Sequence, residues 1–355
     1  MQAIMFHGPG DARLAEVPTP TPGNGELLVR VDAALTCGTD AKAYRRGHPV
    51  LFRTIPSPFG HEFAGTVASV GPQVSAFESG QRVVAANSAP CGDCDECRRH
   101  RESLCESLDF LNGAYAEYLI VPARIVRRNT YRIPDHVACA EAALAEPMAC
   151  VLHGLDAIDL SQGDAVAVIG AGPIGLLFVD LLTRQGQRVI ALDHHPARLR
   201  AARHFGASET VLVSDNLDAL HQARELTERH RGVEAVVEAA GYPDTWEMAL
   251  GMVRKGGQVL LFGGPPAGAK VPLDTRQAHY DELTLKGVFH HTPAHVQRAV
   301  QLITSGHVCA RDYLTANRPL SETIAALQAQ ASDIKTVILP PGAEPAKLGA
   351  LAGVL

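Results

Sequence analysis

The chain has 355 residues, more than one hydrophobic core usually organises, so its length predicts about two domains of roughly 100 to 200 residues each. Hydrophobic residues make up 46% of the chain and charged residues 20%, a composition that excludes a globally disordered protein. The formal net charge of −6 offers a nucleic-acid backbone or an anionic membrane no broad attraction, so we expect a small-molecule or protein partner.

The first ten residues, MQAIMFHGPG, lack the basic stretch and long apolar run of an export signal. No later segment approaches the roughly 20 apolar residues that cross a bilayer. We therefore expect a cytoplasmic protein without a membrane span. In such a chain the eight cysteines are expected to be reduced thiols available to a metal rather than disulfides.

Residues 1 to about 147 are punctuated by Pro and Gly and contain short β-rich runs at 26–31 and 63–70, which predicts a small irregular β domain. Cys37, His61 with Glu62, and Glu146 are scattered through it. Taken singly, each has an ordinary structural interpretation as a buried thiol, a satisfied polar residue or the partner of an arginine. Spacing alone does not assemble them into a site.

A cluster of four cysteines lies within fifteen residues of this first region, at Cys91, Cys94, Cys97 and Cys105. Four thiolates at this spacing suit one tetrahedral zinc, and because they leave no open position, such a zinc has a structural role. The alternatives are an iron–sulfur cluster and four unliganded surface thiols. The lack of a Cys-Pro ending and the three arginines inside the cluster make the iron–sulfur cluster the weaker interpretation.

After Pro147 the periodicity changes. Apolar runs at 165–169 and 188–192 flank a helical stretch at 174–183, which is the order of a βαβ unit. Further strands are expected at 233–238 and 257–262, so the sequence predicts an α/β fold with a doubly wound, mostly parallel sheet covered on both faces. The segment from about 289 to 355 is too short to bury a core alone, and we expect it to return to the first domain.

The turn between the first two of these strands reads G-x-G-x-x-G, from Gly170 through Gly172, Pro173 and Ile174 to Gly175. Because it follows a strand and opens a helix, it predicts a dinucleotide site in which the glycines allow a tight turn, the approach of a pyrophosphate and close helix packing. The alternative is a turn that binds no dinucleotide.

Eighteen residues beyond Gly175, Asp193 ends the second strand, where a carboxylate would accept hydrogen bonds from the hydroxyls of an adenosine ribose. A carboxylate there repels a 2′-phosphate, which favours NAD over NADP. His194 and His195 would partly offset that repulsion if they were protonated.

A glycine-flanked Cys-Gly-Thr-Asp at 37–40, a Gly-His-Glu at 60–62, the four-cysteine lobe and the glycine turn occur in this order in zinc-dependent medium-chain dehydrogenases. The sequence resembles that family from end to end, and its Glu146-Pro147 resembles the polyol branch of sorbitol and threonine dehydrogenases. The resemblance implies a GroES-like β domain over 1–147, completed by 289–355, and a Rossmann domain over 148–288.

Carried over residue by residue, the resemblance implies a catalytic zinc on Cys37, His61 and Glu146, with Glu62 as a neighbour able to replace a ligand. It also implies a structural zinc on the four clustered cysteines. Such a catalytic set leaves a position for an alcohol, whose pKa the zinc would lower.

The resemblance assigns the start of a proton relay to Thr39, whereas the usual relay histidine is replaced by Lys42, so either Lys42 or solvent continues the relay. Arg198 resembles an arginine that packs on adenine. At the end of the nucleotide domain the chain departs from sorbitol dehydrogenases, because it reads Phe-His-His. His290 and His291 are therefore candidates for substrate contact, the alternative being a pair of exposed loop histidines.

Tyr44 is a further candidate for the substrate pocket. Three cysteines match no ligand position and are expected to be buried thiols: Cys139, Cys150 and Cys309.

The predicted function is reversible oxidation of a secondary alcohol, such as a polyol or sugar alcohol, with NAD and zinc. The alternatives are an NADP-linked aldehyde or ketone reductase and a non-catalytic dinucleotide-binding sensor. The apolar strand near 283–289 is expected to extend a sheet across a two-fold axis, giving a homodimer or homotetramer.

Overall fold

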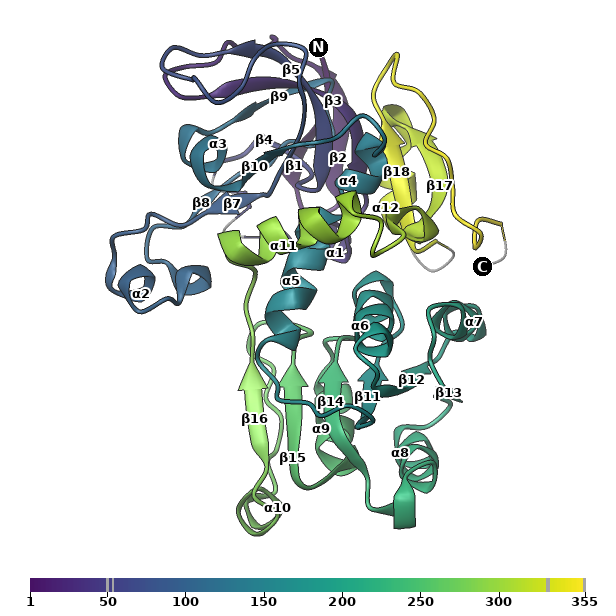
Figure 1. Ribbon diagram of the computed structural model, residues 1–355. Helices are drawn as coiled ribbons and strands as arrows, with labels where there is room; N and C mark the ends of the chain where they lie inside the picture. Colours follow the sequence, from purple (N-terminus) through teal and green to yellow (C-terminus); the bar gives the residue numbers. More distant parts are fainter. Residues whose placement is uncertain (49–50, 53, 330–332, 354–355) are drawn as a thin grey trace. The chain divides into compact units, whose positions relative to one another are not determined.

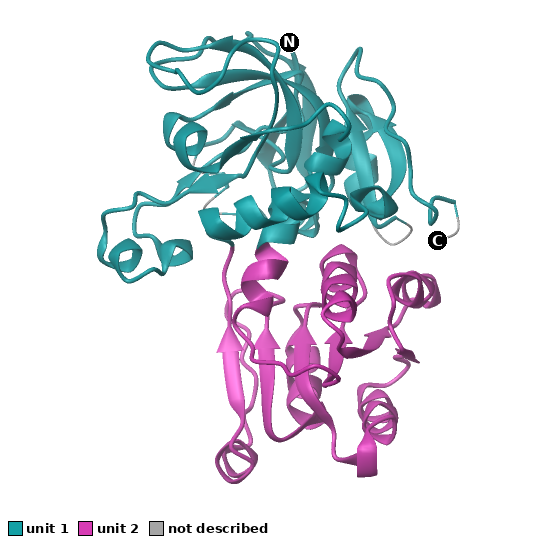
Figure 2. Cartoon of the chain, in the orientation of Figure 1, with its two compact units in different colours: residues 1–149, 291–353 teal, residues 150–290, 354–355 magenta. Residues whose placement is uncertain are grey.

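The computed structural model describes residues 1–48, 51–52, 54–329 and 333–353. The chain divides into two compact units, coloured separately in Figure 2. The first contains residues 1–149 and 291–353, and the second contains residues 150–290. From the sequence we expected the first domain boundary directly after residue 147 and the second directly after residue 288. Within the described ranges, no helix is both long and apolar enough to cross a membrane.

The first unit is built on a seven-stranded sheet whose strands follow the order β10-β6-β5-β3-β18-β17, with β9 also paired to β3 (Figure 1). The central strand β3 (Leu27–Leu35) reads LLVRVDAAL and is buried along most of its length. Its antiparallel neighbour is β5 (Phe63–Val70). The other strands of this sheet are β6 (Arg82–Ala85), β9 (Tyr118–Val121), β10 (Thr130–Arg132), β17 (Leu314–Pro319) and β18 (Lys335–Leu339).

A second, three-stranded sheet of β1 (Gln2–Gly8), β2 (Asp11–Glu16) and β4 (Ser57–Pro58) belongs to the same unit. The core of this unit contains a cluster of aromatic rings. Phe6 stacks on Phe52 with ring centroids 3.8 Å apart, and Phe59 meets Tyr115 edge to face at 5.6 Å. These contacts hold residues 59–63, which lead into β5, against the core.

The C-terminal part of the first unit returns to the sheet begun at the N-terminus. After α11 (Pro293–Thr304), β17 and β18 pair in parallel, and β18 pairs antiparallel with β3 through Val337 and Leu35. The backbone of Thr36 donates to the carbonyl of Thr336 at 3.0 Å. This pairing brings Lys335, the first residue of β18, beside the end of β3. No local pattern in the sequence indicates that these two positions are close together.

The second unit is a six-stranded parallel sheet in the order β13-β12-β11-β14-β15-β16. Numbered within the unit, this is the order 3-2-1-4-5-6 of a Rossmann fold, so the predicted fold class is confirmed. Every residue of β11 is buried, as expected where helices cover both faces of a parallel sheet. The strands are β11 (Ala165–Ile169), β12 (Arg188–Asp193), β13 (Glu209–Leu212), β14 (Val233–Glu238), β15 (Val253–Leu261) and β16 (Thr284–Gly287).

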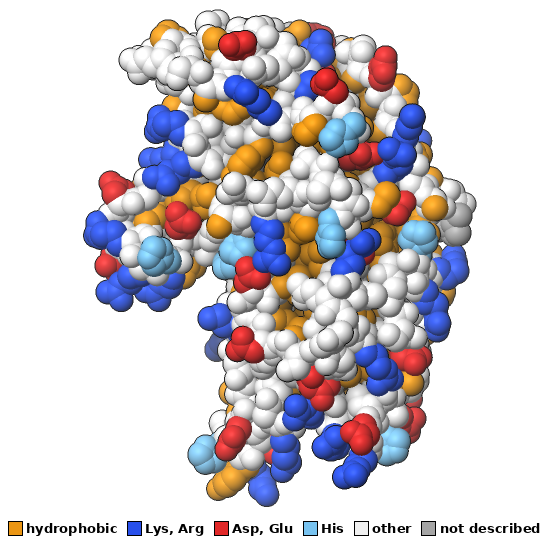
Figure 3. Space-filling model, viewed as in Figure 1, with side chains coloured by type: hydrophobic (Ala, Val, Ile, Leu, Met, Phe, Trp, Pro, Cys, Tyr) orange, Lys and Arg blue, Asp and Glu red, His pale blue; other side chains and the backbone are white. Residues whose placement is uncertain are grey.

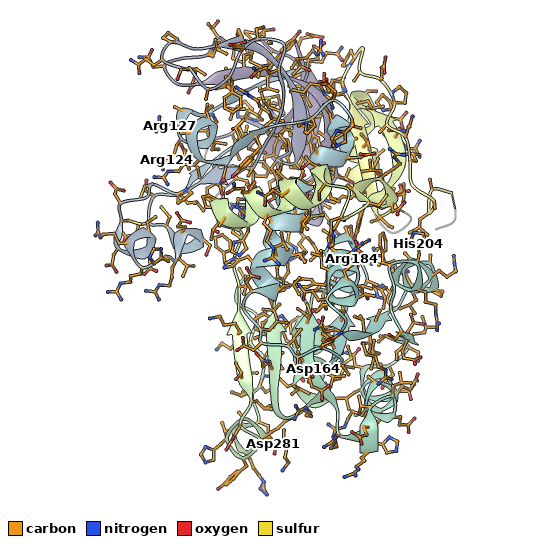
Figure 4. The ribbon with its side chains drawn as sticks, in the orientation of Figure 1. Arg124, Arg127, Asp164, Arg184, His204 and Asp281 are labelled. Carbon is orange, nitrogen blue, oxygen red and sulfur yellow. The ribbon has the colours of Figure 1, made fainter. Side chains whose placement is uncertain are left out.

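Helices connect these strands along both faces of the sheet (Figure 1). The first, α6, begins with Pro at its first position and buries a continuous run from Gly175 to Leu182. Arg184, labelled in Figure 4, lies in its last turn and pairs with Asp180 at 2.6 Å. The helices are α6 (Pro173–Arg184), α7 (Pro196–His204), α8 (Asn216–Glu225), α9 (Pro243–Met252) and α10 (Thr275–Tyr280).

Candidate metal and dinucleotide sites

The four predicted cysteines converge in a lobe that contains α2 (Asp95–Arg98) and a short 3-10 helix (Glu102–Leu104). The sulfurs of Cys91 and Cys97 are 3.9 Å apart, those of Cys94 and Cys105 are 3.9 Å apart, and those of Cys91 and Cys105 are 3.5 Å apart. Four sulfurs each at about 2.3 Å from a tetrahedral zinc lie about 3.8 Å from one another. The lobe therefore fits one zinc ion.

Backbone amides in the lobe point at these sulfurs. The amide of Cys91 lies 3.2 Å from the sulfur of Cys105, and that of Cys94 lies 3.4 Å from the sulfur of Cys91. The amide of Cys97 helps lower the pKa of Cys94 to about 7, whereas burial raises the pKa of Cys97 to about 12. A cation bound by the lobe would favour the thiolate form of Cys97 in particular, because metal ligation by cysteine requires the deprotonated sulfur.

Arginine side chains stabilise the lobe, two from within it and two from a neighbouring helix. Basic side chains gather on the lobe around α2 (Figure 3), where Arg99 and Arg101 pair with acidic residues of α2. From α3 (Ala123–Asn129), Arg124, labelled in Figure 4, donates to the carbonyl of Ser107 at 2.6 Å. Arg128 donates to the carbonyl of Cys91 at 3.1 Å. These bonds anchor both ends of the cysteine segment to the first unit, as a structural role requires.

A second set of possible ligands forms where β3 ends and β5 begins. Cys37 is the N-cap of α1 (Gly38–Arg46), and its sulfur accepts the amide of Thr39 at 3.4 Å. His61 and Glu62 directly precede β5, and the β3–β5 pairing brings them to Cys37. The ligand atoms of Cys37, His61 and Glu62 lie within 4.8 Å of one another. A thiolate, an imidazole and a carboxylate are zinc ligands, so the residues fit such an ion.

Asp40, on the first turn of α1, lies behind His61. The Nδ1 atom of His61 is 2.9 Å from Oδ1 of Asp40, and both side chains are buried. Burial by itself would lower the pKa of His61, but the charges of Asp40 and Cys37 raise it well above its usual value. With the proton of the neutral ring on Nδ1, the lone pair of Nε2 is available to a metal.

Glu146 lies in the first turn of α5 (Ala145–Leu155) and is also buried. Burial raises its pKa to about 7, and it interacts electrostatically with His61, Glu62, Lys335 and Asp40. Several ionisable groups therefore converge in one buried region of the first unit, where a cation would stabilise the carboxylate form of Glu146.

Glu62 has a partner that the sequence analysis missed. Its two oxygens lie 2.7 and 2.5 Å from Nζ of Lys335, and both side chains are buried. The two residues are 273 positions apart, and the one local signal was a lysine at the head of an apolar β run, Lys-Thr-Val-Ile-Leu. The ion pair therefore engages both carboxylate oxygens of Glu62, beside the His61 side chain.

The predicted relay residues share one side of α1. Thr39 and Lys42 are exposed and three residues apart, so they lie on the same helix face. Tyr44 is half-buried against the core, and its hydroxyl donates to the carbonyl of Gly10 at 2.8 Å. The hydroxyl of Tyr44 is thus bound to the backbone of the same unit.

The two candidate substrate histidines differ. His291 is 2% exposed, and its Nε2 lies 3.1 Å from Oδ1 of Asn87 and 4.0 Å from Oε1 of Glu146. The alternative of two exposed loop histidines is therefore wrong for His291. His290 is half-buried and has a positive φ of 60°. Its carbonyl oxygen lies 2.8 Å from Nδ1 of His153.

The three remaining cysteines are less buried than predicted. Cys139 and Cys150 are half-buried, and Cys309 is exposed at the start of a 3-10 helix, so the expectation of a buried thiol is wrong for Cys309. None of the eight cysteines, all of which lie in described residues, forms a disulfide.

In the second unit, the glycines of the turn after β11 meet three different steric demands. Gly170 has φ +92°, and a Cβ there would come within 3.0 Å of Ala240. A Cβ on Gly172 would meet nothing within 4 Å, so this side of the turn is open to a ligand. A Cβ on Gly175 would lie 1.8 Å from the carbonyl oxygen of Gly170. Tight turn, open approach and close helix packing are the three requirements of a dinucleotide turn.

Asp193 ends β12 and is hydrogen-bonded to this turn. Its Oδ2 accepts the amide of Ala171 at 2.8 Å, and its Oδ1 accepts the amide of His195 at 2.8 Å. Nη1 of Arg198 lies 3.7 Å from Oδ2. His194 is exposed beside the carboxylate, with its Nδ1 3.6 Å from Oδ1. The carboxylate is therefore held at the glycine turn, where an adenosine ribose binds in Rossmann folds.

Glu238, the last residue of β14, organises the next loop and was not found from the sequence. Its Oε1 accepts the amides of Ala240 and Gly241 at 2.9 and 2.8 Å and the hydroxyl of Thr245 at 2.8 Å. The side chain is fully buried, and burial raises its pKa. Because Ala240 lies close to Gly170 and its amide donates to Glu238, Glu238 supports the loop that packs against the glycine turn.

A Rossmann sheet with a dinucleotide turn, together with a four-cysteine cluster and a group of Cys, His and Glu side chains in the other unit, is typical of metal-dependent dehydrogenases. Models of known families match both parts of the chain: the alcohol dehydrogenase GroES-like domain over residues 23–135 and the zinc-binding dehydrogenase domain over residues 173–305. The chain belongs to the zinc-dependent medium-chain dehydrogenases, in the polyol branch, and is an oxidoreductase that uses zinc and a nicotinamide dinucleotide.

Similar proteins extend over nearly the whole chain. A sorbitol dehydrogenase of Bacillus subtilis is 30% identical over 92% of this chain and 93% of its own. An erythritol/L-threitol dehydrogenase of Mycolicibacterium smegmatis is 31% identical over 96% and 98%. Among solved structures, a putative zinc-binding dehydrogenase of Sinorhizobium meliloti bound to NADP is 30% identical, with a TM-score of 0.87 over 96% of this chain and 99% of that one.

Proposed function

We propose that the protein oxidises a secondary alcohol, of the polyol or sugar-alcohol type, and transfers the hydride to NAD. The observation that carries this proposal is that half-buried Cys37 and buried Glu146 both interact electrostatically with buried His61, in a chain whose other unit holds Asp193 at a dinucleotide turn. The two relatives named for polyol substrates support the substrate class.

Cys37, His61 and Glu146 would hold the catalytic zinc, and the four clustered cysteines would hold a structural one. When bound at the open set, zinc supplies a Lewis acid that lowers the pKa of an alcohol and polarises the carbonyl product. Asp40 holds His61 in one orientation by its 2.9 Å bond to Nδ1.

The substrate proton would leave along the exposed side of α1. We propose that the hydroxyl of Thr39 accepts this proton while passing its own to the neutral amine of Lys42, three residues further along the same helix face, and that the resulting ammonium group releases the proton to solvent. Tyr44, His290 and His291 are proposed to contribute to substrate recognition. We propose that His291 gives the substrate site a fixed shape, and its burial and its 3.1 Å contact with Oδ1 of Asn87 support this.

NAD is proposed as the cofactor because the carboxylate of Asp193 would accept the ribose hydroxyls and repel a 2′-phosphate. Arg198 is proposed to pack on the adenine. A dehydrogenase structure that is 30% identical to this chain is bound to NADP, so an NADP-linked reductase is the competing candidate. We expect kcat/KM for NAD to exceed that for NADP by at least about tenfold, a difference of roughly 1.4 kcal/mol. Equal efficiency with both cofactors would refute the NAD assignment.

The experiment that tests the activity is a substrate screen of purified, zinc-loaded protein. Polyols, amino alcohols and cyclic alcohols are offered with NAD, and NADH absorbance is followed. A secondary alcohol that is turned over by the wild type and not by His61→Ala supports the proposal. Tight NADH binding without turnover of any substrate in the panel, in protein with both zinc sites filled, favours the non-catalytic sensor instead.

We further propose a homodimer or homotetramer assembled through the edge of the parallel sheet. All four residues of β16 are exposed, including the large apolar side chain of Leu285. Tyr280 and Phe289, close to β16 in the sequence, also expose large apolar side chains. An unpaired edge with apolar neighbours favours pairing with a second copy across a two-fold axis. Light scattering at micromolar concentration tests this, and a monomer there would contradict it.

A further inference from the structure

We propose that Tyr115 is a positioning residue for the metal site, and that its hydroxyl holds His61 in place through Asp40. The proposal rests on the proposed function, because it takes His61 as a zinc ligand. Nothing in the sequence singles out Tyr115, which lies 75 residues after Asp40.

The three side chains form one buried hydrogen-bonded chain. The hydroxyl of Tyr115 lies 2.6 Å from Oδ2 of Asp40, and Oδ1 of Asp40 lies 2.9 Å from Nδ1 of His61. Tyr115 and Asp40 are 0% exposed, and His61 is 4% exposed. The carboxylate of Asp40 thus has a donor at each oxygen, with Tyr115 on the side away from the metal ligand.

The hydroxyl also lies 3.1 Å from the carbonyl oxygen of Leu35. A phenol has a single proton to donate, and the shorter contact to a charged acceptor is the stronger one. Burial and the charge of Asp40 raise the pKa of Tyr115 well above its usual value, so the hydroxyl remains protonated. The proton of Tyr115 is therefore assigned to Asp40.

The ring of Tyr115 has a separate role. It meets Phe59 edge to face at 5.6 Å, and it packs so closely on Gly60 that a Cβ there would lie 2.7 Å from the ring. The amide of Tyr115 also donates to the carbonyl of Phe59 at 2.9 Å. The ring therefore shapes the backbone that delivers His61, whereas the hydroxyl acts on Asp40. Replacing Tyr115 with Phe removes the action on Asp40 and keeps the packing of the ring.

A carboxylate that accepts from the outer nitrogen of a ligating histidine fixes its tautomer and orientation, and losing such a partner costs about 10- to 100-fold in metal affinity. Tyr115 acts one hydrogen bond further out, so its effect should be smaller. Without the hydroxyl, Oδ2 of Asp40 is left buried without its donor, and the carboxylate gains freedom to turn away from His61. We expect Tyr115→Phe to weaken zinc binding at the Cys37 and His61 site by about 3- to 10-fold.

The test uses the full-length protein as wild type, Tyr115→Phe and a matched control, Tyr131→Phe. Tyr131 belongs to the same unit, and its hydroxyl lies 3.3 Å from the carbonyl of Pro293, so the same atom is removed from a hydrogen bond away from His61. Zinc affinity of the labile site is measured by competition with a chelator of known affinity. The visible spectrum of protein with cobalt at that site reports ligand geometry independently of turnover.

The expected result is weaker zinc binding and an altered cobalt spectrum in Tyr115→Phe, with both unchanged in Tyr131→Phe and with the zinc of the four-cysteine lobe retained in all three proteins. A folded Tyr115→Phe with wild-type zinc affinity and cobalt spectrum would overturn the proposal, as would an equal loss of affinity in both variants. If His61→Ala keeps the labile zinc, the proposed catalytic site itself fails, and this outcome is distinct because it does not involve Tyr115.

Discussion

Lys335 and Glu62 form a buried ion pair in which the ammonium group contacts both carboxylate oxygens, at 2.7 and 2.5 Å. The same ammonium donates to the carbonyl of Thr36 at 2.9 Å, so three acceptors match its three protons. Thr36 precedes Cys37, and Glu62 follows His61. A lysine from the C-terminal part of the chain therefore joins the two segments that carry the proposed ligands.

The first prediction concerns this pair. Lys335→Met leaves a buried carboxylate without its cation, and we expect the free energy of unfolding to fall by about 3 to 5 kcal/mol. The double variant Lys335→Met/Glu62→Gln removes both charges and should recover most of that loss. Denaturant unfolding of the wild type, both single variants and the double variant measures these effects. A double variant as unstable as Lys335→Met would show that the ion pair is not the cause.

The second prediction concerns metal content. We expect about two zinc ions per subunit, one of which resists chelation because four thiolates enclose it. The other should be removed by the chelator together with activity, and adding zinc should restore both. Elemental analysis before and after dialysis against the chelator measures this. A single zinc in folded, metal-replete protein is incompatible with two sites.

The third prediction separates chemistry from structure. His61→Ala should abolish turnover while NADH binding and the fold persist, because the dinucleotide turn is built on other residues. Cys94→Ser removes one of the four thiolates in the lobe, so metal-coupled folding free energy is lost and the first effect should be a lower Tm. Thermal unfolding, NADH titration and kcat are compared for both variants. Near wild-type kcat in zinc-bound His61→Ala would reject the site assignment.

The fourth prediction concerns the proton relay. If Lys42 moves the alcohol proton onward from Thr39, Lys42→Ala should lower kcat and reshape its dependence on pH while zinc content stays unchanged. Arg45→Ala, at an exposed position of the same helix, serves as the control for a lost positive charge. An unchanged pH profile in Lys42→Ala would leave solvent as the proton carrier.

The fifth prediction concerns Glu238, whose pKa in the folded protein is raised by burial. The folded state then binds the proton more tightly than the unfolded state does. The stabilising contribution of that proton is present below 4.5, the ordinary pKa of a glutamate, and is lost as the pH rises through the raised pKa of the folded state. Relative to Glu238→Gln, the wild type should therefore be more stable at about pH 4 than at about pH 7. Parallel pH dependences of the two unfolding free energies would contradict this.

Much of the second unit was predictable because its signals are local. The runs at 165–169 and 233–238 coincide with β11 and β14, and the helix expected at 174–183 is one residue shorter at each end than α6. In a parallel sheet covered on both faces, each strand is a continuous apolar run. The glycine pattern likewise needs only its own six residues, so Gly170, Gly172 and Gly175 were found from spacing.

The residues that support the candidate sites were not predictable in the same way. Asp40 belongs to the Cys-Gly-Thr-Asp motif, but the motif does not indicate which residue it contacts, and Tyr115 and Lys335 appear ordinary in sequence. The partners of these three residues lie 21, 75 and 273 positions away. Glu238 ends a strand whose pattern predicted only burial.

From the sequence alone we predicted an irregular β domain and a parallel α/β domain, the four-cysteine lobe and the dinucleotide turn. Each could be predicted because the signals for it lie within short segments. Only the tertiary structure decided that Glu62 is bound by Lys335 and that Asp40 lies between His61 and Tyr115. Those contacts depend on β18 joining β3 and on Tyr115 packing against Gly60. The pairing of strands distant along the chain is set by the burial of the whole core, which no single segment specifies.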